Sequence, residues 1–128
     1  MPPDRADLPG VTATLCSYES FFGRYHPLTL RFLAEVAAAY RYHGELAQAR
    51  TLFERAVRDL GRHLGRGHDA RLRSLKRLRD LLIEQREYEN ARLVQRELVE
   101  CCTERFGADH PDTVAARAEH AVAFLAAG

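Results

Sequence analysis

The chain has 128 residues, of which 46% are hydrophobic and 29% charged, and its formal net charge is +1. This length and balance predict one soluble globular domain and exclude two. The small net charge argues against nucleic acid as a partner, and no apolar run approaches the roughly 20 residues that cross a bilayer, so we expect no membrane segment.

The first nine residues are predicted to form a loose tail. Residues 1–9 hold three of the five prolines and lack the apolar stretch of a secretory signal. The three cysteines are Cys16, Cys101 and Cys102. Because their number is odd and two are adjacent, we expect no disulfide framework, and the expected location is a reducing cytoplasm.

A repeat of 42 residues organises the rest of the chain. Residues 23–64 align with residues 65–106 without a gap, and ten of the 42 aligned positions are identical, against about three expected by chance. Such a repeat predicts one supersecondary unit stacked on the next. Three residue types keep the interval throughout: Gly23, Gly65 and Gly107; His26, His68 and His110; Leu30, Leu72 and Val114.

The apolar spacing predicts six helices and no strand. Apolar residues recur every three or four positions, which is the period of one face of an α-helix. The predicted helices span 10–22, 27–43, 45–63, 69–85, 87–105 and 111–127. They form one repeat domain over 10–128, with half-repeats at 10–22 and 107–128 around full repeats at 23–64 and 65–106. We expect a core that includes Leu33, Val36, Tyr40, Ala49, Phe53, Leu75, Leu78, Ala91 and Leu98.

The loop before two of these helices resembles a known repeat. It reads Gly23-x-x-His26-Pro27-x-Thr29-Leu30 in the first case and Gly107-x-x-His110-Pro111-Asp112-Thr113-Val114 in the second. These loops resemble the 42-residue tetratricopeptide repeats (TPRs) of kinesin light chains and of bacterial proteins that carry the same loop. The resemblance covers residues 10–128. It implies an all-α fold, a right-handed α-solenoid of antiparallel helix pairs, whose first helices line a concave groove for a peptide or a partner's surface.

The second repeat departs from this pattern at several positions. The Asn pair that holds the peptide backbone in kinesin light chains is also absent, and the matching positions are Ala34-Glu35, Lys76-Arg77 and Ala118-Glu119. In the second repeat, Asp69 and Arg71 replace Pro and Thr of the loop, Arg79 replaces a small residue, Arg86 replaces the turn Gly, and Gln95 replaces Phe53.

No arrangement of residues in the sequence predicts an enzyme, a metal site or a cofactor. The three repeated histidines would lie roughly 10 Å apart in a stacked solenoid, too far to share an ion. We expect each of them to brace its own loop and helix start. Cys102 is expected in the core and Cys101 at the helix surface. The sequence contains neither a Gly-x-Ser-x-Gly motif nor a Gly-rich phosphate loop.

One helix concentrates basic residues on a single stripe. The TPR alignment turns this basic stripe toward the groove, where it suits an acidic peptide or a C-terminal carboxylate, because Arg offers bidentate hydrogen bonds. The alternative is a solvated face paired with Glu87, Glu89 and Glu97 of the next helix. The predicted partner-binding residues are Arg73, Lys76, Arg77 and Asp80 of the stripe, with Arg31, Arg41 and Tyr42 of the preceding repeat.

The terminal helices suggest a second function, self-association. Phe21 and Phe22 in the first helix and Phe124 and Leu125 in the last have no neighbouring repeat to cover them. Either the chain is part of a longer array, or these helices pair between molecules into a homo-oligomer. RNA binding or a helical enzyme is a third and weaker hypothesis, because the basic patch is short and no active site is found.

Overall fold

The computed structural model describes residues 7–127, and it describes side chains as far as Glu119. Six helices and no strand are present in this part of the chain, as the sequence predicts. They are α1 (Leu8–Phe22), α2 (Pro27–Tyr42), α3 (Leu46–Leu64), α4 (Asp69–Glu84), α5 (Tyr88–Phe106) and α6 (Pro111–Ala127). The first helix takes in the end of the predicted tail, because Pro9 fits its first turn. Residues 1–6 of that tail lie outside the described residues.

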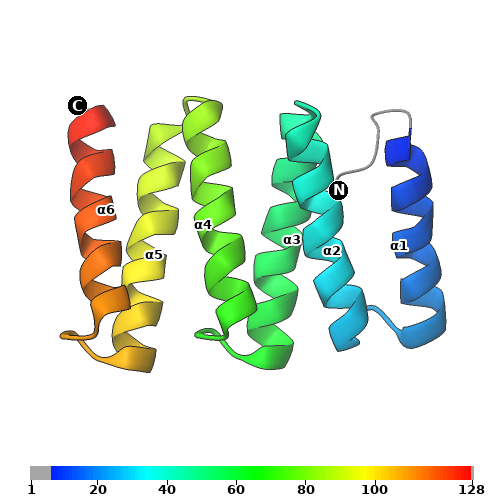
Figure 1. Ribbon diagram of the computed structural model, residues 1–128, viewed down its shortest axis with the longest axis horizontal. Coiled ribbons are helices and arrows are strands. Elements are labelled where there is room, and N and C mark those ends of the chain that lie inside the picture. The colour runs from blue at the N-terminus through cyan, green and yellow to red at the C-terminus, as the bar shows by residue number, and fades with distance from the viewer. Residues whose placement is uncertain (1–6, 128) are drawn as a thin grey trace.

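The helices form one α-solenoid of antiparallel neighbours, with short connections at alternate edges (Figure 1). Each helix packs against the next one along the chain, and α2 also touches α4 directly. The second helix of one repeat therefore lies between the first helices of two repeats. We call the surface formed by α2, α4 and α6 the even-helix face. In the described part of the chain, no helix is both long and apolar enough to cross a membrane.

A histidine caps the first helix of each unit. Nδ1 of His26, His68 and His110 accepts a hydrogen bond, 3.1 Å long in all three, from the backbone N–H two residues further on. This bond gives a partner to one of the N–H groups that the first turn of a helix leaves without one. The predicted role of these histidines as braces of the helix start is confirmed.

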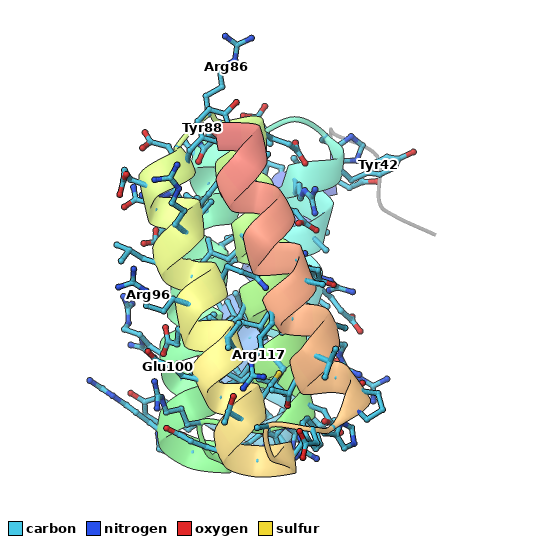
Figure 2. All side chains as sticks on the ribbon, turned by 90° about the vertical axis from the view of Figure 1, so that its left-hand side faces the viewer. Tyr42, Arg86, Tyr88, Arg96, Glu100 and Arg117 are labelled. Carbon is cyan, nitrogen blue, oxygen red and sulfur yellow. The ribbon has the colours of Figure 1, made fainter. Side chains whose placement is uncertain are left out.

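The turn inside each helix pair needs a residue with positive φ. Gly44 supplies it in the first repeat with φ 79°, and Arg86 supplies it in the second with φ 61°. Both turns close with the same hydrogen bond, because the N–H groups of Glu45 and Glu87 donate to the carbonyls five residues earlier, at 2.9 and 2.8 Å. Arg86 projects from its turn away from the helices (Figure 2). The repeat thus keeps the turn geometry even where it has lost the glycine.

The interior contains the predicted core with two differences. Eight of the nine predicted core side chains are buried. Tyr40 is only half-buried, and its hydroxyl lies 2.6 Å from Thr12 Oγ1. The prediction for Cys101 is wrong, because this side chain is fully buried rather than at the helix surface. Arg71 covers it and donates from Nη1 to Cys101 Sγ at 3.3 Å.

Candidate functional site

A groove of about 640 Å³ lies between α2 and α4 on the even-helix face. Its lining combines apolar residues with exposed charged residues of the two helices. The apolar residues come from α2, α3 and the start of α4, and include Leu30, Ala34, Leu60, Leu64 and Ala70. The charged residues are Arg31, Glu35, Arg73 and Arg77. The α2–α4 groove is therefore both apolar and basic.

The groove recurs one repeat further on in a smaller form. A second groove of about 180 Å³ lies between α4 and α6, at the end of α5. Each residue that lines it stands 42 positions after a residue that lines the α2–α4 groove. Two larger side chains enter the second groove, Phe106 for Leu64 and Lys76 for Ala34, and two acids enter it, Asp69 for Pro27 and Asp112 for Ala70. The repeat produces both grooves, and the side chains make them different.

Side-chain size explains why the α2–α4 groove is open. Where α1 meets α2, the rings of Phe32 and Tyr18 stack with their centroids 4.8 Å apart. The equivalent positions where α3 meets α4 hold Ser74 and Leu60, and both of these smaller residues line the groove. The α3–α4 interface thus lacks the two rings that fill the α1–α2 interface.

Three of the predicted binding residues, Arg31, Arg73 and Arg77, line the α2–α4 groove together. Arg31 approaches Glu35 of its own helix only to 4.0 Å, and its side chain is 80% exposed. Such an exposed pair contributes little. Arg73 and Arg77 are also exposed, and their guanidinium groups have no ion-pair partner among the described side chains.

Two further predicted residues lie apart from this groove. Lys76 lines the smaller α4–α6 groove, together with Arg73. Tyr42 is 69% exposed at the end of α2, and it projects away from the helices (Figure 2). Its ring meets His43 edge to face, with the centroids 5.0 Å apart. Neither residue is part of the lining of the α2–α4 groove.

The last two predicted residues already have partners within the protein. Arg41 Nε donates to Glu84 Oε1 at 2.9 Å, which joins the end of α2 to the end of α4. Asp80 accepts from Arg79 Nε at 3.0 Å. The first pair joins two repeats, and the second lies within α4. Both leave Arg41 and Asp80 less available to a ligand than the groove arginines.

The acids that the alternative interpretation assigns to the basic stripe bind other residues. Among the described side chains, none of the three pairs with Arg73, Lys76 or Arg77. Instead, Glu97, Glu89 and Glu87 accept hydrogen bonds from Arg71, Arg92 and Asn90, at 2.7, 3.1 and 3.3 Å respectively. The following helix thus leaves the groove cations without neutralising partners.

Arg71 has a structural role that the sequence analysis missed. Its side chain is 8% exposed and crosses the junction of α3, α4 and α5. Nε donates to the Val57 carbonyl at 3.2 Å, Nη1 to the Arg66 carbonyl at 2.9 Å, and Nη2 to Glu97 at 2.7 Å. Gly61 leaves room for it, since a Cβ there would lie 2.9 Å from Arg71 Nε. The signal in the sequence is Arg71 at the loop position of Thr29, shortly after Gly61 near the end of the preceding helix.

The titratable residues include two buried thiols. Burial raises the pKa of Cys101, although the guanidinium groups of Arg66 and Arg71 oppose this shift. Burial also raises the pKa of Cys102. Both thiols are therefore protonated and poorly reactive near neutral pH. Within the described residues, no group of three or more His, Cys, Asp or Glu side chains could hold a metal ion.

The residues predicted for self-association lie at the two ends of the solenoid. Phe21 is 82% exposed and Phe22 39% exposed, and their rings meet edge to face with the centroids 4.8 Å apart. Phe124 and Leu125 belong to α6, but their side chains lie outside those that the structure describes. One end of the chain therefore presents an exposed aromatic pair.

Antiparallel helix pairs of one repeat length, stacked in a row with a groove between successive first helices, define an α-helical repeat protein. The chain belongs to the tetratricopeptide repeat family, whose model matches residues 29–70 and 80–112. The segment between these matches, residues 71–79, contains Arg71, Ser74 and Arg79. It is the part of the second repeat that differs most from the first in charge.

Solved structures share the fold. One is a crystal structure of a Podosopora anserina protein assigned as a kinesin light chain with nearly identical TPR-like repeats. Its sequence is 22% identical to this chain, and the match covers 95% of this chain with a TM-score of 0.77. A point variant of that protein has the same identity and TM-score. This chain spans 58% and 57% of the length of those two chains. Among curated proteins, none matches.

Proposed function

We propose that this protein is a non-enzymatic adaptor that binds an acidic segment of a protein partner in the α2–α4 groove. Membership of the TPR family supports a protein–protein interaction module. The observation that carries the finer proposal is the trio of Arg31, Arg73 and Arg77 around a partly apolar groove. Carboxylates of an acidic segment would accept charge-assisted hydrogen bonds from these guanidinium groups.

We propose that this adaptor, or scaffold, works in the cytoplasm. All three cysteines are free, and two of them are buried without a disulfide. Free thiols are typical of proteins that work in a reducing compartment. The chain therefore needs no oxidising environment to form the fold described above.

The test is a pull-down from lysate of the source organism with three forms of the protein. The groove variant is Arg73→Glu with Arg77→Glu. The matched control is Arg58→Glu with Arg96→Glu, which reverses two exposed charges on α3 and α5 instead; Arg96 lies on the outer side of α5 (Figure 2). We expect a partner retained by the wild type and the control and lost from the groove variant. Identical bands from all three forms would contradict the proposal.

Self-association is the second candidate function, and the exposure of Phe21 favours it. A ring that is 82% exposed at the end of a solenoid is well placed to pack on another molecule. Light scattering over a range of concentrations tests this candidate. A concentration-dependent increase in mass that Phe21→Ser removes would support it, whereas a constant monomer mass at high concentration would exclude it.

A further inference from the structure

The α2–α4 groove contains a hydroxyl group that has no partner within the described part of the protein. Ser74 is 2% exposed and lines the groove. Other helical hydroxyls, such as those of Thr14, Ser17 and Thr51, donate to the carbonyl four residues earlier. Ser74 has no hydrogen bond to any residue that the structure describes. Because Ser74 lines the groove, its hydroxyl is available to a polar atom of a ligand bound there.

Two cations lie beside this hydroxyl on the same helix. Arg73 and Arg77 are four residues apart on α4, which places their side chains one above the other, and Ser74 follows Arg73 directly. All three residues line the groove. A carboxylate bound in the groove would therefore lie among groups that donate charge-assisted and directional hydrogen bonds.

The rest of the groove favours an apolar body on the same ligand. Leu30, Leu60 and Leu64 are part of the lining. Leu64, which is 37% exposed, offers the most surface of the three, while Leu30 and Leu60 form the floor beneath it. The volume of about 640 Å³ lies within the range of about 300–1,000 Å³ that small-molecule sites occupy. Covering this apolar surface would stabilise a complex by the hydrophobic effect.

We infer that the α2–α4 groove binds a small amphipathic organic anion, with a carboxylate on Arg73, Arg77 and Ser74 and an apolar body on the leucines. The inference goes beyond the proposed adaptor function, because the ligand is a small molecule and not a segment of a protein. The two uses share Arg73 and Arg77, so an occupied groove would compete with an acidic partner. A medium-chain fatty carboxylate has the required chemistry.

The α4–α6 groove serves as a comparison inside the same molecule. Ala116 takes the place of Ser74 there, so the hydroxyl is missing. The groove has a volume of only about 180 Å³, and Asp69 and Asp112 both line it. An anion would meet two carboxylates and little space. We therefore expect the ligand at the α2–α4 groove alone.

The test is a titration of the purified full chain with sodium octanoate, followed by amide NMR. Saturable shift changes are expected around Ser74 and along the facing part of α2. Ser74→Phe puts at this position the residue that the first repeat has, Phe32, and should fill the groove and abolish binding. Ser74→Ala should weaken binding about tenfold through loss of one hydrogen bond. Arg96→Gln removes an exposed cation on α5, far from the groove lining, and should leave the affinity unchanged.

Two probes separate the parts of the ligand. Octanol has the chain without the charge, and inorganic phosphate has charge without the chain, so both should bind at least about tenfold more weakly than octanoate. Equal binding of octanol, or shifts centred on Phe21, would overturn the inference, as would unchanged affinity in a folded Ser74→Phe variant. If the Ser74→Phe variant does not fold, Arg73→Gln replaces it, because Arg73 is exposed and its substitution leaves the core intact. The inference then requires that Arg73→Gln weakens octanoate binding. No partner protein is present, so the result is independent of the pull-down.

Discussion

Arg79 Nη1 donates a hydrogen bond of 2.6 Å to Gln95 Oε1, at the two positions where the first repeat holds Ala37 and Phe53. Ala37, Phe53 and Gln95 are all fully buried. Gln95 Nε2 in turn donates to the Ala116 carbonyl at 2.8 Å, so both ends of the amide have partners. In the second repeat, Arg79 thus takes the place of the small Ala37, and Gln95 takes the place of the large Phe53. Repeats with different chemistry can therefore stack on the same backbone.

This pairing predicts the effect of changing its members singly and together. Arg79→Ala should lower the free energy of unfolding by about 1–3 kcal/mol, because it leaves the buried Gln95 Oε1 without its donor. Adding Gln95→Phe recreates the pair of the first repeat and should recover most of that loss. Urea unfolding of the two single variants and the double variant gives the coupling energy. A double variant less stable than either single variant would show that the two positions do not compensate.

The histidine caps predict a stability effect that depends on one ring nitrogen. His68→Ala removes the acceptor for the Ala70 N–H and should cost about 0.5–2 kcal/mol. His68→Asn, whose side-chain oxygen also accepts at this position, should retain most of the stability. Thermal unfolding followed by circular dichroism measures both. Equal losses in the two variants would mean that His68 acts through packing and not through its cap.

The turn residues predict opposite effects in the two repeats. Arg86→Gly should stabilise the protein by up to about 1 kcal/mol, because Gly adopts positive φ without the strain that Arg bears. Gly44→Ala, at φ 79°, should destabilise it by about 1 kcal/mol for the same reason. Denaturant midpoints of the pair provide the measurement. A loss of stability in Arg86→Gly would indicate that the Arg side chain makes a contribution larger than the strain of its backbone.

The cysteines predict selective labelling and a loss of stability at high pH. Cys16 is exposed and should react with iodoacetamide in the folded protein, while Cys101 and Cys102 should react only on unfolding. Burial raises the pKa of both buried thiols above the ordinary value of 9.0. The unfolded state therefore loses these protons first, so stability should fall as the pH rises above that value. Mass spectrometry after labelling and unfolding curves at increasing pH test the two effects, and labelling of all three cysteines in the folded state would contradict the burial.

The repeat made the fold predictable, and the same repeat located part of the site. Because Gly, His and apolar residues keep one interval, every helix could be placed within two residues of its observed ends. The positions of Arg31, Arg73 and Arg77 on successive first helices follow from that alignment, and these three line one groove. The 42-residue repeat is therefore sufficient to place those residues whose position depends only on the phase of their helix.

Features that depend on compensation between helices were not predictable in the same way. Arg71 lies so close to Gly61 of another helix that a Cβ there would be 2.9 Å from its Nε. The sequence shows the two replacements but not their contact. Arg41 pairs with Glu84, 43 residues away, so its helix phase alone does not show whether it is free. Likewise, the open space beside Ser74 is recognised only when the α3–α4 interface is compared in three dimensions with the α1–α2 interface.

The most direct test of the central claim is the affinity of the captured partner for purified protein, measured by calorimetry. The wild type, the Arg73→Glu and Arg77→Glu double variant, and the Arg58→Glu and Arg96→Glu control are titrated under the same salt conditions. The account predicts that the control binds like the wild type and that the groove variant binds at least about 100-fold more weakly, since two charge-assisted contacts are reversed. Equal affinities for the groove variant and the wild type would contradict a partner site in the α2–α4 groove.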